Sequence, residues 1–308
     1  MAQSNPLHFG VLLHQFKLST DELIERAQLI EEVGFDSCWV GDHMWASADP
    51  AAEHPECLTL LTALLAHTSR IRMGPLVICY AFRNPAYLAK ALSTIDNLGH
   101  GRLEIGLGIG WKPAEFDAYG WQFLPTAERL RQLDETVQIL KLMFTQPQTT
   151  FKGRYYSVTD AFNSPKPVQK PHPPITIAGT GEKMMLRLVA KHADWWNLPG
   201  GAQDKFDHLL EVLKGHCRAV GRDFNTLRIS QMNMICLGRN QKEVDAKVEE
   251  IKGTPFEKIA LRGTPEQIVA AYRERAAKGI TGFITQFTED PNPETIKLFA
   301  NEVMPALR

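Results

Sequence analysis

A histidine and an aspartate stand side by side at the end of a strand-like segment near the N-terminus. The segment begins at Phe35, and Asp42 and His43 follow it directly after Gly41. A histidine exchanges protons near neutral pH, and a neighbouring carboxylate can orient its ring or hold a ligand hydroxyl. His43 is therefore the first candidate for a catalytic acid or base. The alternative is that both side chains only hydrogen-bond the loop backbone.

Two glycine-containing segments also follow strand-like runs. Residues 106–111 read Gly-Leu-Gly-Ile-Gly-Trp, and Trp111 stands where the dinucleotide fingerprint GxGxxG requires its third glycine. Such glycines let the backbone approach a flat ring or a phosphate, although tight strand packing is an alternative. Residues 179–181, Gly-Thr-Gly, run into a helix predicted over residues 183–192. Their amide groups are expected at a helix N-terminus, which attracts anions.

Three further residues are candidates to contact a substrate. His14 follows the first strand-like segment, Trp45 lies two residues beyond His43, and Trp111 follows the glycine segment. The two tryptophans are the candidates for an aromatic wall, although tryptophans more often belong to the core. For His14 a structural role is the alternative.

A metal site or a covalent nucleophile has weaker support. Asp42, His43, Glu53 and His54 could be combined into a metal site, but the chain has no HxH or HExxH spacing at these positions. There is no GxSxG motif, and no cysteine stands beside a basic partner. We therefore expect no metal and no serine or cysteine nucleophile.

Strand-like and helix-like segments alternate along the chain and must position these residues. Eight strand-like segments begin near Leu7, Phe35, Ile71, Arg102, Pro174, Ala193, Leu227 and Thr281. This alternation predicts an α/β protein with a (β/α)8 TIM barrel, and an open doubly wound sheet is the alternative. In a barrel the candidate residues meet at the mouth, because active sites lie at the carboxyl ends of the strands.

Two spacings between strands are too long for a single βα unit. They predict insertions after strands 4 and 7, between Arg102 and Pro174 and between Leu227 and Thr281. The first begins with a helix near residues 127–144 and becomes aromatic and Pro-rich, which predicts a hairpin and an extended return that cover part of the mouth. No linker divides the chain, so we expect one domain over residues 1–308.

Composition restricts the class of partner. The 308 residues carry 34 Lys and Arg against 35 Asp and Glu, a formal charge of −1, which gives no electrostatic reason to bind nucleic acid or an anionic membrane. The five cysteines show no CxxC pair and fit a reducing compartment. With neither a signal-peptide pattern nor a membrane-length apolar run, the sequence favours a cytoplasmic protein with a small-molecule partner.

Motifs along nearly the whole chain resemble the bacterial luciferase-like superfamily. They are the run from Phe35 to His43, the run Phe82-Arg-Asn-Pro85 continuing to Gly101-Arg-Leu-Glu-Ile-Gly-Leu-Gly-Ile-Gly-Trp111, the run Pro165-Lys-Pro-Val-Gln-Lys-Pro171 leading to Ile175-Thr-Ile-Ala-Gly179, and the tail from Gly263 to Leu307. The resemblance implies a (β/α)8 barrel, usually a homodimer, that uses either FMN or the deazaflavin coenzyme F420.

The residues at the second strand end favour the deazaflavin. A Gly-Asp-His sequence, here ending at His43, is similar to the F420-dependent branch, whereas the luciferases proper tend to show Glu-His-His. The resemblance implies an F420-dependent oxidoreductase, a dehydrogenase or reductase, in which His43 exchanges the proton that accompanies hydride transfer. An FMN-dependent monooxygenase is the alternative. The cofactor contacts implied by the resemblance are Asp42, a bulge at Leu76 and Val77, the backbone of Gly108, Ile109 and Gly110, and the phosphate-side residues Ala178, Gly179, Thr180 and Gly181.

The chain departs from the sugar-phosphate dehydrogenase of this branch at two positions. Ser47 stands where that enzyme has a tryptophan, and Trp111 stands where it has a glutamate after the glycine segment. Both departures disfavour a sugar phosphate as substrate. They also predict that His43 lacks an acidic partner.

Overall fold

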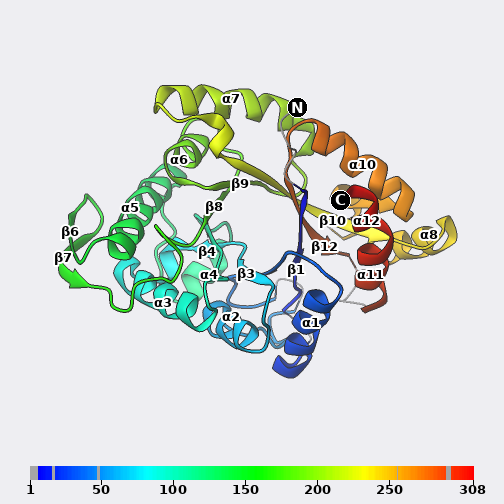
Figure 1. Cartoon of the computed structure of the whole chain (residues 1–308), viewed down its shortest axis with the longest axis horizontal. Coiled ribbons are helices and arrows are strands. Elements are labelled where there is room, and N and C mark those ends of the chain that lie inside the picture. Colours follow the sequence, from blue (N-terminus) through cyan, green and yellow to red (C-terminus); the bar gives the residue numbers. More distant parts are fainter. Residues whose placement is uncertain (1–5, 16–17, 47–48, 255, 289–292) are drawn as a thin grey trace.

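Parallel strands surrounded by helices form the centre of the protein, in a computed structural model that describes residues 6–15, 18–46, 49–254, 256–288 and 293–308 (Figure 1). The strands hydrogen-bond in the order β3-β2-β1-β12-β10-β9-β8-β5-β4. Their bounds are β1 His8–Leu12, β2 Ser37–Val40, β3 Arg72–Pro75, β4 Ile78–Cys79, β5 Ile105–Gly108, β8 Ile175–Ala178, β9 Trp195–Leu198, β10 Arg228–Leu237 and β12 Gly282–Phe287. Each of the eight predicted strand positions is occupied.

The barrel closes because β3 and β4 are two halves of one interrupted strand. The interruption is at Leu76 and Val77, whose peptide bond is cis. On one side of it β3 pairs with β2, and on the other β4 pairs with β5. A parallel bridge between Met73 and Leu103 completes the ring. The predicted (β/α)8 barrel is confirmed, and the alternative of an open sheet is wrong.

Helices follow the strands and begin at the residues that the sequence marks. The longer ones are α1 Thr20–Glu32, α2 Cys57–Ala66, α3 Pro85–Leu98, α5 Thr126–Thr145, α6 Met185–His192, α7 Phe206–Ala219, α8 Gln241–Glu250 and α10 Pro265–Ala277. Ser19 and Glu22 form a capping box at the start of α1. The side chain of Asn84 accepts hydrogen bonds from two amides at the start of α3. Pro85, the first residue of this helix, has no amide hydrogen that would need an acceptor.

The two predicted insertions are present after β5 and after β10. The first contains α4 Pro113–Ala118, then α5, then the antiparallel hairpin of β6 Gln148–Lys152 and β7 Ser157–Phe162. The hairpin packs against α5 at the periphery of the barrel (Figure 1). The insertion was predicted to cover part of the mouth, and of its elements α4 lies there, whereas the hairpin does not. The second contains α8, α9 Phe256–Ile259 and β11 Leu261–Gly263, which pairs with β10. The chain ends with α11 Pro293–Leu298 and α12 Met304–Leu307.

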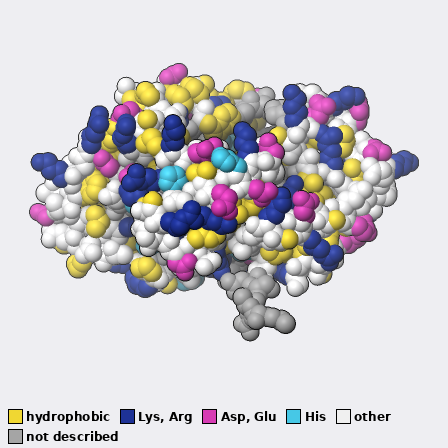
Figure 2. All heavy atoms as spheres, turned by 90° about the horizontal axis from the view of Figure 1, so that it is seen from above, with side chains coloured by type: hydrophobic (Ala, Val, Ile, Leu, Met, Phe, Trp, Pro, Cys, Tyr) yellow, Lys and Arg dark blue, Asp and Glu magenta, His cyan; other side chains and the backbone are white. Residues whose placement is uncertain are grey.

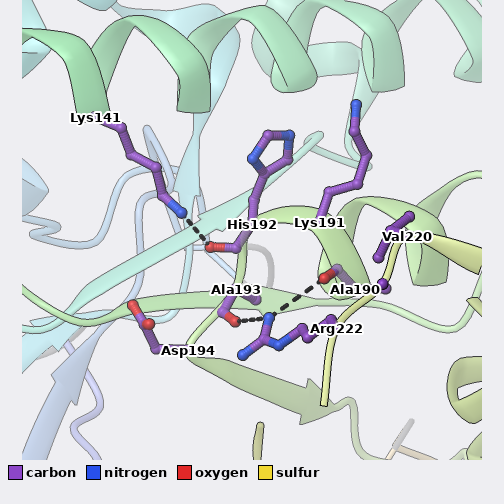
Figure 3. Close-up of a pocket in the computed structure, with 9 residues that line it drawn as sticks. Lys141, Ala190, Lys191, His192, Ala193, Asp194, Val220 and Arg222 are labelled. Atoms are coloured by element: carbon purple, nitrogen blue, oxygen red, sulfur yellow. Dashed lines mark hydrogen bonds between the residues drawn. The ribbon is translucent and has the colours of Figure 1, made fainter. Parts of the chain in front are cut away.

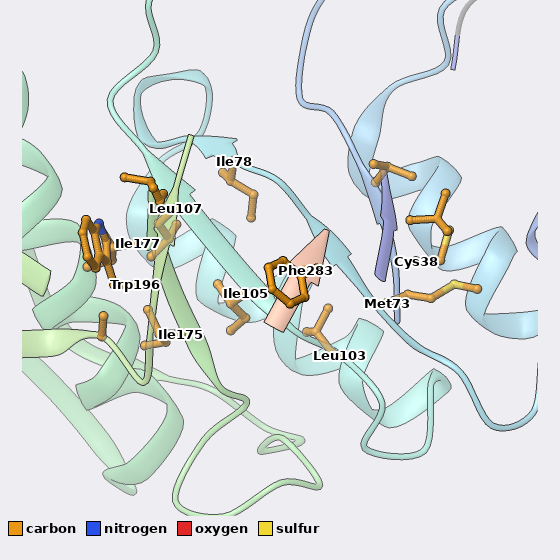
Figure 4. Close-up of a cluster of buried hydrophobic side chains, with 14 of the residues drawn as sticks. Cys38, Met73, Ile78, Leu103, Ile105, Leu107, Ile175, Ile177, Trp196 and Phe283 are labelled. Carbon is orange, nitrogen blue, oxygen red and sulfur yellow. The ribbon is translucent and has the colours of Figure 1, made fainter. Parts of the chain in front are cut away.

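The barrel interior is filled by large rings beside glycines. A Cβ atom on Gly10 would lie 2.8 Å from Nε1 of Trp39, and one on Gly282 would lie 2.9 Å from the ring of Trp195. Apolar side chains of neighbouring strands pack in register, as Ile105 beside Ile175 shows (Figure 4). This packing makes the barrel a rigid support for the residues at its mouth.

Candidate active site at the carboxyl end of the barrel

His43 lies just beyond the carboxyl end of β2 and is held by a glutamate of α4. Its Nδ1 atom is 3.0 Å from both carboxylate oxygens of Glu115, which also accepts a hydrogen bond from the amide of Met44 at 3.1 Å. The Glu115 side chain is 2% exposed and that of His43 is 34% exposed. Because a carboxylate only accepts, Nδ1 carries the proton, and Nε2 is the nitrogen left to exchange protons with a ligand.

The surroundings of Glu115 keep it ionised. Burial raises the pKa of this carboxyl. The hydrogen bonds from His43 and Met44 and the charges of His43 and Lys112 lower it by more, so the pKa lies below its ordinary value. The expectation that His43 lacks an acidic partner is therefore wrong. The glutamate comes four residues after Trp111, in the first turn of a helix that starts at Pro113, so a search for a glutamate directly after the glycines misses it.

Asp42 is turned away from solvent and is bound by protein groups. Its carboxylate accepts two hydrogen bonds from Arg83, at 2.7 and 2.8 Å, and one from the amide of Cys79 at 2.9 Å. Arg83 also pairs with Glu56. These contacts tie the loop after β2 to the interrupted third strand and to the start of α2, and they position His43.

The bulge at Leu76 and Val77 faces the glycine segment after β5. A Cβ atom on Gly108 would collide with the side chain of Val77. Gly110 has φ +70°, and a Cβ atom there would lie 2.8 Å from Sγ of Cys79. Five of the predicted cofactor contacts thus lie together where adjacent strands are interrupted or end, namely Leu76, Val77, Gly108, Ile109 and Gly110.

A buried arginine that the sequence reasoning missed holds this glycine segment. Arg129, 6% exposed and on α5, donates to the carbonyls of Ile109 at 3.1 Å and Gly110 at 2.5 Å. It also donates to the carbonyl of Leu124 at 2.9 Å and stacks on the ring of Phe123. It fixes the path of the segment without entering the mouth.

The predicted phosphate-side segment, Ala178 to Gly181, leaves the carboxyl end of β8. Gly179 has φ +144°, and its carbonyl accepts from Nε1 of Trp196 at 2.9 Å. The following helix α6 starts at Met185, after a turn. The amides of residues 179–181 therefore precede the helix and do not belong to its first turn, which corrects the predicted helix start.

The residues predicted to contact a substrate divide into two groups. The exposed ring of Trp111 meets that of His43 edge to face, with centroids 5.6 Å apart, and Trp45 stacks on Tyr119 at 6.1 Å. These aromatic rings lie on the α4 side of the mouth. His14 is buried, and its Nε2 atom is 2.9 Å from the carbonyl of Phe287. This bond connects the ends of β1 and β12. Ser47 lies outside the described residues.

A cavity of about 480 Å³ lies at the other end of the barrel, beside the start of β9 (Figure 3). Its cations are bound to protein groups: Lys141 donates to His192 O at 2.8 Å, Arg222 to Ala193 O at 2.5 Å, and Lys191 to the carboxylate of Asp134 at 3.2 Å. These contacts give the cavity a structural explanation. In the described ranges no three His, Cys, Asp or Glu side chains are grouped to hold a metal ion. None of the described helices has the length and apolar character of a membrane span.

The fold and the residues at its mouth define a (β/α)8 barrel with a histidine and glutamate pair beside a glycine-lined surface. A family model described as luciferase-like monooxygenase matches residues 6–258. The chain belongs to this family, which confirms the resemblance read from the sequence.

Relatives in this family use two cofactors. An F420-dependent glucose-6-phosphate dehydrogenase of Amycolatopsis mediterranei is 34% identical, over 93% of this chain and 94% of the relative. An FMNH2-dependent dimethylsulfone monooxygenase of Pseudomonas putida is 28% identical, over 73% of this chain and 60% of the relative. A solved F420-dependent secondary alcohol dehydrogenase, in complex with an F420-acetone adduct, has a TM-score of 0.85 at 20% identity, covering 99% of this chain and 100% of that chain. At that identity the likeness concerns the fold.

Proposed function

We propose that the protein is an oxidoreductase that transfers a hydride between coenzyme F420 and a small organic substrate, with His43 as proton donor or acceptor. The observation that carries the proposal is the bond between His43 Nδ1 and the buried carboxylate of Glu115, beside the glycine segment after β5. The relative from Amycolatopsis supports the choice of F420.

The residues at the mouth fit a flat, phosphate-bearing cofactor. The side of Gly108 that lacks a Cβ atom is filled by the Val77 side chain, and that of Gly110 by Cys79 and Phe116, so these glycines let the segment pack closely against the bulge. We propose that the face of the ring lies against the backbone of residues 108–110 and the bulge at Val77.

On the phosphate side, the amide of Gly179 donates to the carbonyl of Asn197 at 3.3 Å, so the proposal assigns the phosphate to the following amides of Thr180 and Gly181. When bound there, the deazaflavin supplies the hydride chemistry.

His43 contributes proton exchange at Nε2. The carboxylate of Glu115 accepts from Nδ1, which holds the ring in one tautomer and leaves Nε2 to meet the substrate. Asp42 supports this geometry through Arg83 and the amide of Cys79. Because the Asp42 carboxylate is shielded from solvent and held by these groups, we propose that it serves the cofactor side of the site by positioning the loop of His43.

An FMN-dependent monooxygenase is the second candidate, because one of the relatives that match this chain is named for reduced FMN. In that case the proton role of His43 would need revision. On the family resemblance we further propose a homodimer that acts on a small molecule in the cytoplasm.

The test of the proposed function is equilibrium binding of F420 and of FMN to the purified protein, followed by fluorescence. We expect micromolar or tighter binding of F420 and at least tenfold weaker binding of FMN, a difference of about 1.4 kcal/mol or more. Preference for FMN would overturn the proposal and make oxygen consumption with reduced flavin the next assay.

A further inference from the structure

The outer layer of the barrel encloses a cavity of about 390 Å³ between β10 and α10. Its lining comes from β10, β11, α10 with the turn after it, and the start of α7 with the short helix η2 Gln203–Lys205, and all of these lining residues lie in the described ranges. Side chains along β10 alternate between the barrel interior and the helices outside it. Asn233 faces the helices, because its Oδ1 atom accepts from Arg275 of α10. Gln231, two residues earlier, therefore faces outward too, and the cavity is separate from the mouth around His43.

Arg275 brings a guanidinium group to this cavity without a carboxylate partner. Its Nη1 atom donates to Oδ1 of Asn233 at 2.7 Å, and in the part of the chain that the structure describes the group makes no other hydrogen bond and no ion pair. Burial lowers the pKa of Arg275 by more than the neighbouring Tyr272 and Glu274 raise it. An arginine still keeps its charge at neutral pH, and its planar N–H groups match a carboxylate. The remaining donors of Arg275 are therefore available to an anion in the cavity.

Gln231 adds an unused acceptor beside this guanidinium. Its side chain is 1% exposed and lines the cavity, and its Oε1 atom has no hydrogen-bond partner among the described residues. Asn233 lies between the two groups, since its Nδ2 atom donates to the backbone carbonyl of Gln231 at 3.3 Å while its Oδ1 atom accepts from Arg275. A buried oxygen without a partner is costly, so a ligand that brings a hydrogen-bond donor to it gains affinity.

The charges of the lining favour a ligand with one negative charge over one with two. Nζ of Lys278 lies 3.1 Å from Asp207 and 4.0 Å from Glu274, so its charge is compensated. Asp204 adds a further carboxylate to the lining. Acidic and basic side chains are interspersed over the face of the molecule that carries α7, so no large positive surface surrounds the cavity (Figure 2). Arg275 is thus the uncompensated cation of this lining, and it balances a single carboxylate.

We propose that this cavity binds a small α-hydroxy or α-amino monocarboxylate, whose carboxylate pairs with Arg275 and whose hydroxyl or amino group donates to Oε1 of Gln231. The buried side chains of Phe206 and Ile280 supply an apolar wall for its carbon chain. This site goes beyond the proposed function and does not depend on which cofactor the mouth binds.

Isothermal titration calorimetry with matched probes tests the chemistry of the ligand. L-lactate and L-alanine carry both groups, propionate carries the carboxylate alone, and inorganic phosphate supplies a second negative charge. We expect lactate or alanine to bind saturably with a Kd of about 1 mM or tighter, and the tighter of the two identifies the donor as a hydroxyl or an ammonium group. Propionate and phosphate should bind at least about tenfold more weakly. No saturable binding of either acid, or binding of propionate or phosphate that is as tight, would overturn the proposal.

Variants of the two polar residues test the contacts. Arg275→Gln should weaken binding of the preferred acid about tenfold or more, because the carboxylate loses its cation. Arg275→Lys keeps the charge without the planar fork, should weaken binding less, and keeps the test open if the glutamine variant does not fold. Gln231→Met should weaken binding of the preferred acid and leave that of propionate unchanged, a difference that a purely structural role would not produce.

Two further variants are the controls for the place of binding. Arg273 lies on the exposed face of α10 and donates to the carbonyl of Ala306 at 2.8 Å, and His43 lies at the mouth. Arg273→Gln and His43→Gln should therefore bind the acid like the wild type. Wild-type affinity in a folded Arg275→Gln protein would overturn the proposal. A loss of affinity in His43→Gln would overturn it as well, because the acid would then bind at the mouth.

Discussion

Glu115 lies 3.0 Å from Nδ1 of His43 although the two residues are 72 positions apart in the chain. The contact forms because α4, the start of the first insertion, brings its first turn over the end of β2. The same carboxylate caps the amide of Met44, so it fixes the backbone beside the histidine as well as its ring. This pair joins the predicted proton-exchanging residue to an element outside the regular barrel.

Replacing His43 tests proton exchange directly. His43→Ala should lower turnover by about 100-fold or more and leave F420 affinity within about twofold, because the ring meets the substrate and not the phosphate side. Steady-state kinetics and fluorescence titration measure the two effects. Unchanged turnover would remove His43 from the mechanism.

Replacing Glu115 tests its positioning role. Glu115→Gln should lower kcat/KM by about 10- to 100-fold and change its pH dependence, because a neutral amide replaces the carboxylate that holds Nδ1 of His43. Glu115→Asp should recover part of the activity. Glu53→Gln, an exposed change in the loop after β2, is the matched control. If Glu115→Gln kept the wild-type pH profile while losing activity, the carboxylate would have a structural role alone.

Replacing Gly179 tests whether the segment after β8 contacts the phosphate of the cofactor. In Gly179→Ala the new Cβ atom would lie 2.9 Å from Cγ of Met185 in a backbone conformation with φ +144°. We expect F420 binding at least tenfold weaker, about 1.4 kcal/mol. Gly215→Ala, within α7 and with no close neighbour nearer than 3.9 Å, should bind normally. Wild-type affinity in Gly179→Ala would place the phosphate elsewhere.

Replacing Arg129 tests whether a residue outside the mouth fixes the backbone of Ile109 and Gly110, which we propose to face the cofactor ring. Arg129→Met leaves three carbonyls without their donor and should lower the free energy of unfolding by about 2–4 kcal/mol, with a loss of F420 affinity at temperatures where the variant is folded. Arg131→Met, on the exposed face of the same helix, should change stability by about 0.5 kcal/mol or less. Full F420 affinity in a folded Arg129→Met protein would contradict the role.

The sequence was sufficient for the barrel because its signals are local. Strand-like runs such as Ile175–Ala178 and capping residues such as Ser19 and Asn84 act within a few positions. The same locality placed His43 and the glycines at strand ends. Glu115 and Arg129 could not be predicted in this way, because their partners depend on how an insertion packs. The start of α6 was misplaced for a related reason, since residues 182–184 form a turn that charge and polarity do not distinguish from a helix.

The barrel floor, at the end away from His43, makes stability depend on pH through His8. Burial lowers the pKa of His8 to about 4, an effect that Asp36 opposes and that Arg228, Arg72 and Arg308 reinforce. Its Nε2 atom lies 2.8 Å from Oγ of Ser37, inside the barrel. The folded protein thus takes up a proton at His8 less readily than the unfolded chain does.

The sign of the effect follows from this difference. Between the ordinary pKa of 6.5 and the folded value of about 4, the unfolded chain binds more protons at this residue, so the contribution of His8 to stability is complete above pH 6.5 and is lost as the pH falls toward 4. The loss amounts to at most about 3 kcal/mol. Urea unfolding at pH 7 and pH 4.5 should show a smaller pH dependence in His8→Gln than in the wild type. His208→Gln, on the surface of α7, should keep the wild-type slope, and an identical slope in His8→Gln would mean that His8 is already charged in the folded barrel.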